Sequence, residues 1–107
     1  MSTRAKKQND AASFLEQELG APLTFASLLE AVRLGEEQSQ AVFAAKLGIS
    51  RSHLCDIEHG RKAVSVQRAA EFAHVLGYSA EQFVRLALQA LVDDAGLHLH
   101  VAVAAAE

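Results

Sequence analysis

Residues 39–60 read SQAVFAAKLGISRSHLCDIEHG, and this stretch decides the fold. Ser39 and Ser50 stand where the caps of two helices belong, and a glycine follows each of the two apolar patterns. Only Gly48 and Ile49 separate the first helix from the cap of the second. The apolar residues recur at helical spacing on both sides of the turn: Phe43, Ala44, Leu47, Leu54 and Ile57. The stretch therefore predicts two short helices joined by a sharp turn.

The flanking sequence predicts further helices by the same signals. Cap residues, helical spacing and glycine stops favour helices over residues 11–19, 24–35, 65–77 and 79–94. Ser79 with Gln82 predicts a capping box at the last of them. Residues 97–103 alternate with period two, which is typical of a strand. The predicted class is an all-α bundle of about five core helices with an extra N-terminal helix and a short C-terminal strand.

Composition excludes several classes of protein. The chain has 107 residues, half of them apolar, and its single cysteine excludes an internal disulfide framework and a cysteine-rich zinc site. We find neither an apolar run of the ~20 residues that a membrane span needs nor an export signal, so we expect a soluble cytoplasmic protein. The pair His98 and His100 lacks a third ligand, and no metal or cofactor is expected.

Catalysis is not expected either. Ser52, His53 and Asp56 are the residue types of a hydrolytic triad, but close neighbours on one helix cannot readily form a serine–histidine–carboxylate relay around a substrate. The chain also lacks a glycine loop of the kind that cradles phosphates. A binding protein is therefore favoured over an enzyme.

The two-helix stretch strongly resembles the Xre/Cro-type, lambda-repressor-like helix-turn-helix family of prokaryotic and phage regulators. The resemblance covers roughly residues 24–88. It rests on the Ser-Gln start at 39–40, Ala44 at the helix crossing, Leu-Gly-Ile-Ser at 47–50 and Ile-Glu-x-Gly-Arg at 57–61. It implies a sequence-specific DNA-binding regulator, most often a repressor. In such a regulator the second helix lies in the major groove while the first crosses the DNA backbone.

The resemblance also implies roles for individual residues. Base edges are expected to be read by the outward residues at the start of the second helix: Arg51, Ser52, Cys55 and Asp56. Contacts to phosphate are expected from Gln40, Ser50, His53, Arg61 and Lys62. Arg33 and Glu58 stand where the family usually has a partly buried ion pair, a structural role. Taken outside the motif, Arg51 is most simply a solvated surface residue, and Cys55 a small apolar filler or a thiol sensor.

The net charge of −3 opposes binding to a polyanion, but the local balance does not. Residues 33–68 include six basic and four acidic residues, which leaves a local excess of positive charge. Such a modest excess predicts a shallow dependence on salt for each monomer, so dimerisation has to contribute to affinity.

The C-terminal part predicts a second chain, because the last helix is apolar on more than one face and a lone strand lacks its ladder partners. A homodimer is the simplest arrangement, in which the last helix and the strand 97–103 of two copies pair. It presents two recognition helices about one DNA turn, ~34 Å, apart to a near-palindromic operator. The predicted interface residues are Leu88, Leu91, Val92, Leu97, Leu99, Val101 and Val103.

Two alternatives stay open. The chain is also compatible with an antitoxin that binds a small toxin, adds its strand to the toxin's sheet and represses its own operon. A pure interaction module with a degenerate motif is a weaker interpretation. In either case the expected organisation is a flexible basic tail (1–10), a helix and linker (11–23), the DNA-binding domain (24–94) and a strand and tail for dimerisation or partner binding (95–107).

Overall fold

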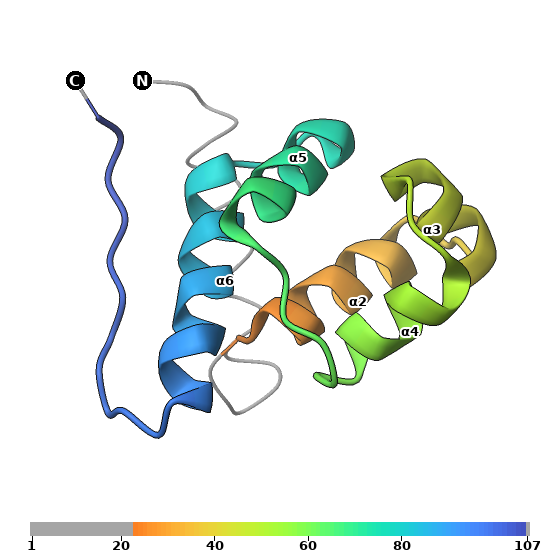
Figure 1. The fold of residues 1–107 in the computed structure, drawn as a ribbon. Coiled ribbons are helices and arrows are strands. Elements are labelled where there is room, and N and C mark those ends of the chain that lie inside the picture. The colour runs from red at the N-terminus through yellow and green to blue at the C-terminus, as the bar shows by residue number, and fades with distance from the viewer. Residues whose placement is uncertain (1–22, 107) are drawn as a thin grey trace.

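The computed structural model describes residues 23–106, which form five helices and, within that range, no strand. The helices are α2 (Phe25–Gly35), α3 (Gln40–Leu47), α4 (Arg51–Glu58), α5 (Val66–Leu76) and α6 (Ala80–Asp94). Helices α3 and α4 form one pair and α5 and α6 another, with α2 between the pairs (Figure 1). The all-helical class predicted for the core is confirmed.

Four of the predicted helix starts are confirmed in detail. Thr24 and Ser27 form a reciprocal capping box at α2, in which each side-chain oxygen accepts from the backbone N–H of the other residue. Ser39, Ser50 and Ser65 each accept a hydrogen bond from the backbone N–H three residues later. These bonds satisfy donors that the first turn of a helix leaves unpaired, so the short helices begin where the hydroxyl residues stand.

The predicted capping box at α6 is wrong. The helix begins after Ser79, but the Ser79 side chain makes no capping hydrogen bond. The amide nitrogen of Gln82 is instead buried without a hydrogen-bond partner among the described residues. The Gln82 side chain is thus turned into the protein and not back toward the first turn.

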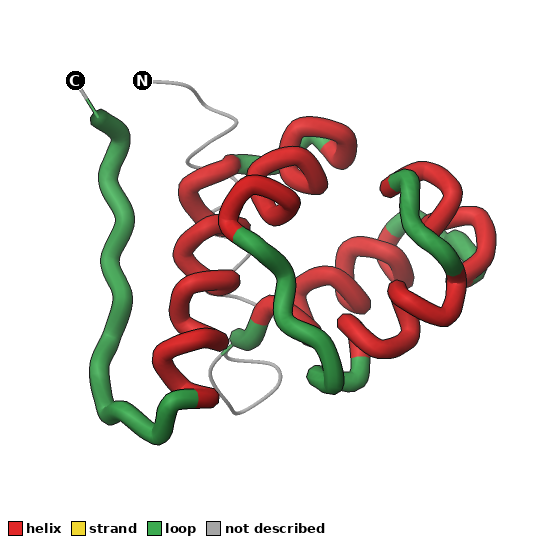
Figure 2. Tube along the Cα trace, viewed as in Figure 1, coloured by secondary structure: helices red, strands yellow, loops and turns green. Residues whose placement is uncertain are grey.

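The predicted C-terminal strand is not formed either. Residues 97–106 run as an extended loop beside α6 (Figure 2), because no strand of the described chain offers them a ladder. The helix predicted over residues 11–19 and the basic tail lie outside the described residues.

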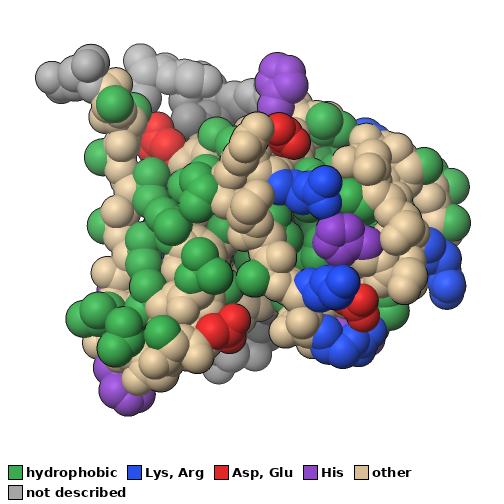
Figure 3. Space-filling model, in the orientation of Figure 1, with side chains coloured by type: hydrophobic (Ala, Val, Ile, Leu, Met, Phe, Trp, Pro, Cys, Tyr) green, Lys and Arg blue, Asp and Glu red, His purple; other side chains and the backbone are tan. Residues whose placement is uncertain are grey.

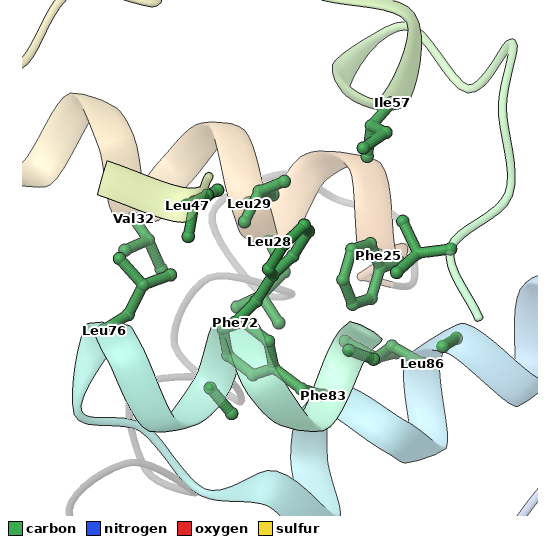
Figure 4. Close-up of a cluster of buried hydrophobic side chains, with 14 of the residues drawn as sticks. Phe25, Leu28, Leu29, Val32, Leu47, Ile57, Phe72, Leu76, Phe83 and Leu86 are labelled. Carbon is green, nitrogen blue, oxygen red and sulfur yellow. The ribbon is translucent and has the colours of Figure 1, made fainter. Parts of the chain in front are cut away.

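The core lies where α2 meets the other helices (Figure 4). Phe25 of α2 packs edge-on against Phe83 of α6, with ring centroids 5.8 Å apart and an interplanar angle of 87°. Leu29 is fully buried at the centre of α2. Leu54 and Ile57 of α4 pack in the same cluster. Because α4 packs on α2 through this apolar face, its opposite face is directed to solvent.

The turn between α3 and α4 depends on a left-handed residue. Gly48 has a φ of +74°, and the N–H of Ile49 donates to Ala44 across it at 3.0 Å. A side chain strains this backbone conformation, whereas glycine adopts it freely. Ala44, 1% exposed, lies one turn earlier in α3.

Gly48→Ala is therefore expected to lower the free energy of unfolding by about 1 kcal/mol. A methyl group added at either Gly48 or Gly35 meets no heavy atom within 4 Å, so crowding does not contribute. Gly35→Ala, at the end of α2 without a positive φ, is expected to raise stability by about 0.5–1 kcal/mol. Urea unfolding followed by circular dichroism measures both. Equal effects in the two variants contradict the left-handed requirement at Gly48.

Candidate nucleic-acid interface

A buried carboxylate fixes the C-terminal end of α4. The Glu58 side chain is 0% exposed and accepts from Arg33 at both oxygens, from Nε at 2.8 Å and from Nη2 at 3.0 Å. Gln40 at the start of α3 donates to the same carboxylate at 3.1 Å, and Arg33 Nη1 donates to the carbonyl of Gln38. The hydrogen bond from Arg33 to Glu58 raises the pKa of the guanidinium above its usual value. One carboxylate therefore ties α2, α3 and α4 together.

The first turn of α4 is the most open part of the candidate surface. Arg51 and Ser52 are both exposed, and Arg51 makes no hydrogen bond or ion pair with any residue of the described chain. The oxygen of Ser50 accepts from the N–H of His53 at 3.0 Å, which leaves the hydroxyl proton to donate outward. A free guanidinium at a capped helix start suits recognition of base edges or phosphate.

The second turn of α4 is tied to the residues that follow the helix. Asp56 accepts from Arg61 Nε at 2.9 Å, and the same arginine lies 3.6 Å from the sulfur of Cys55 through Nη2. His59 Nδ1 lies 3.5 Å from that sulfur. The hydrogen bond to Asp56 raises the pKa of Arg61. Of the four residues predicted to read bases, Arg51 and Ser52 are exposed, whereas Cys55 and Asp56 are half-buried and bonded within the chain.

The backbone after α4 wraps onto the end of the helix. Gly60 has a φ of +72°, and the N–H groups of Arg61 and Lys62 both donate to the carbonyl of Asp56, at 2.8 and 3.3 Å. This turn presents Arg61 and Lys62 at the surface beside α4. Lys, Arg and His side chains gather on this side of the molecule, whereas apolar side chains cover much of the area over α6 (Figure 3).

Two of the acidic residues near this surface have basic partners. Asp56 pairs with Arg61, and Glu36 lies 3.4 Å from the Lys46 ammonium. Exposed pairs of this kind add little stability, but each partner reduces the repulsion that the carboxylate exerts on a phosphate.

Among the contacts that sequence reasoning missed, two join residues far apart in the sequence. The resemblance predicts only a phosphate contact for Gln40, yet one of its amide hydrogens is bonded to Glu58, which orients the side chain. The side chain of Gln89 was not singled out, although it bonds the backbone of the C-terminal loop at two points. Neither contact has a local signal, because both join residues at least ten positions apart.

The predicted interface residues form an apolar area around α6 and the C-terminal loop. Leu91, Leu97 and Leu99 are 47%, 50% and 59% exposed. The others are half-buried: Leu88, Val92, Val101 and Val103. None of the described helices has the length and apolarity that crossing a bilayer requires.

Comparison with known protein families identifies the chain's central region. The family described as helix-turn-helix matches residues 29–83, which run from α2 into α6 and include the whole two-helix unit. Neither the curated proteins nor the solved structures contain a match to this chain.

Proposed function

Because the chain belongs to the helix-turn-helix family of DNA-binding regulatory domains, we propose that it is a sequence-specific repressor that binds a near-palindromic operator as a homodimer. The observation that carries this proposal is the first turn of α4. This turn presents exposed Arg51 and Ser52, and the C-terminal end of the same helix is fixed by buried Glu58. A rigid helix with a polar outward face is what insertion into the major groove requires.

The residues around α4 have distinct roles in this proposal. Arg51 holds guanine O6 and N7 through a bidentate guanidinium, and Ser52 donates to or accepts from a neighbouring base. Phosphates on either side are contacted by Gln40, Ser50, His53, Arg61 and Lys62. The second amide hydrogen of Gln40 is available for this contact while the first is held by Glu58.

Asp56 and Cys55 act through Arg61 and not as independent readers. Asp56 holds the guanidinium at 2.9 Å beside α4, and Cys55 lies within 3.6 Å of it. The ion pair between Asp56 and Arg61 keeps Arg61 near the edge of the groove, and the guanidinium offsets the negative charge of Asp56.

Selection of bound sequences from random duplex DNA by the purified protein tests the proposal. We expect enrichment of a near-palindrome whose half-sites are ~34 Å, about 10 base pairs, apart. Affinity for the selected duplex is expected to fall linearly on a logarithmic scale as salt increases. Failure of any duplex to compete better than random DNA contradicts the proposal.

A second candidate function is that of an antitoxin that represses its own operon. The exposed leucines of α6 and the C-terminal loop favour it, since a small toxin is one partner that could cover them. Purification from the native host distinguishes the two functions. A small basic protein recovered in fixed proportion supports the antitoxin, and operator binding by the protein alone supports the free-standing repressor.

A further inference from the structure

The side chain of Gln89 on α6 takes the place of a neighbouring strand. Its Nε2 donates to the carbonyl of Leu99 and its Oε1 accepts from the N–H of Val101, both at 2.8 Å. A residue in a parallel ladder bonds two backbone groups in the same way, one on each side of the residue that it faces. Asp93 accepts from the same Nε2 at 2.9 Å, which orients the amide.

This clamp leaves the opposite edge of the loop unpaired. Peptide groups are planar and trans, so the N–H of His100 points away from the carbonyl of Leu99, and its C=O points away from the N–H of Val101. Both backbone groups of His100 therefore face away from Gln89. They make no hydrogen bond within the described chain.

A further hydrogen bond ties the start of the loop to α6, and the loop also borders a pocket. The N–H of Leu97 donates to the carbonyl of Val92 at 3.3 Å. The His100 residue lines a pocket of 580 Å³ between α6, the start of α2 and the loop that follows α4. The extended segment runs beside α6 (Figure 1) and is held on one side, while its opposite backbone edge makes no hydrogen bond within the described chain.

We propose that this edge pairs antiparallel with the same segment of a second copy, about a two-fold axis at His100. The inference rests on the homodimer of the proposed function and specifies how it forms. In this register His98 faces Ala102 of the other copy, and each such pair exchanges two backbone hydrogen bonds. The segment becomes a strand only when the second copy supplies its ladder.

The side chains of this register complement one another. Leu97 of one copy lies opposite Val103 of the other, and Leu99 lies opposite Val101, so one face of the ribbon is apolar throughout. Leu97 and Leu99 are 50% and 59% exposed in the single chain, and Leu91 of α6 extends the area. A slip by one residue places His98 and His100 against leucine and valine.

The composition of the edge favours a second copy over an unrelated occupant. Residues 97–106 contain no proline and no Asp, Glu, Lys or Arg, which are the residues that keep solvent-facing edges from pairing. An antiparallel pair of identical segments therefore brings no Asp, Glu, Lys or Arg side chains together. It also closes after two copies, because each copy has one such edge.

Substitutions that act on the clamp and on the edge separately test this proposal in the full chain. Gln89→Ala releases the loop, and His100→Pro removes the outward N–H while the bonds to Gln89 remain possible. We expect each to raise the dissociation constant of the dimer at least tenfold in sedimentation equilibrium. The matched controls are Gln67→Ala, an exposed glutamine of α5, and His100→Ala, which keeps the backbone N–H. Both are expected to leave the dimer intact.

Hydrogen exchange of the backbone amides of the C-terminal loop tests the pairing directly. The amide of Val101 is expected to be protected at all concentrations through Gln89, and to lose that protection in Gln89→Ala. The amide of His100 is expected to gain protection only as the dimer forms. Deletion of residues 97–107 supplies the monomer reference.

The outcomes separate this inference from the proposed function. A dimer that persists in both Gln89→Ala and His100→Pro overturns the inference, as does a wild-type protein that stays monomeric. Protection of the His100 amide only in the presence of a different protein overturns it as well, and favours a heterologous partner. Every variant is expected to bind a single half-site selectively. If the wild-type protein does not bind a half-site selectively, the proposed function is overturned instead.

Discussion

Arg33→Ala is expected to lower the free energy of unfolding by about 3–5 kcal/mol, because it leaves a buried carboxylate without its cation. Glu58 is 0% exposed, and Arg33 supplies two of its three hydrogen bonds. In the intact protein this side chain is closed to solvent, so its charge depends on these hydrogen bonds. For a domain of this size, whose total stability is on the order of 5–15 kcal/mol, such a loss unfolds a large fraction of the protein at moderate urea concentrations.

The double variant Arg33→Met, Glu58→Leu separates the cost of a stranded charge from the net value of the pair. Apolar replacement of a whole buried ion pair is often neutral, so we expect the double variant to recover most of the stability lost by Arg33→Ala. Urea unfolding followed by circular dichroism measures all the variants. A loss below about 1 kcal/mol in Arg33→Ala means that water reaches Glu58 and contradicts the network.

The helices could be predicted from the sequence because their signals are local. Thr24, Ser39, Ser50 and Ser65 each bond the backbone three residues later, so the residue that starts the helix also marks its start. Gly48 marks its turn in the same way, through a backbone conformation that glycine favours. The family match over residues 29–83 includes Ser39, Gly48, Ser50 and Ser65.

The parts that could not be predicted depend on contacts that no local sequence pattern specifies. Period-two alternation in 97–103 indicates an extended chain but not whether a ladder partner exists, and none exists within the described chain. The local pattern at Ser79 likewise cannot show that the amide of Gln82 is buried. The outward position of Cys55 and Asp56 on α4 could be predicted, but not the capture of both by Arg61 from beyond the helix.

Arg61 is thus held by Asp56, whereas Arg51, the arginine of α4, makes no ion pair within the described chain. Arg51→Ala is expected to weaken binding to the selected operator by about 1–3 kcal/mol and to relax preference at one base pair. The physical reason is the loss of a bidentate pair that only one base presents in the major groove. Competition among duplexes that differ at single positions measures both quantities.

Two further variants distinguish base reading from plain electrostatic attraction. Arg51→Lys keeps the positive charge but loses the planar fork, so we expect it to relax the same base preference while affinity for random DNA stays near that of the wild type. Lys62→Ala is expected to weaken all sequences about equally and to reduce the slope of log affinity against log salt by about 1. If Arg51→Ala behaves as Lys62→Ala does, with a change in the salt slope and none in preference, Arg51 contacts phosphate. In that case the first turn of α4 does not lie against the base edges, and the readers of the operator must be sought in another part of the chain.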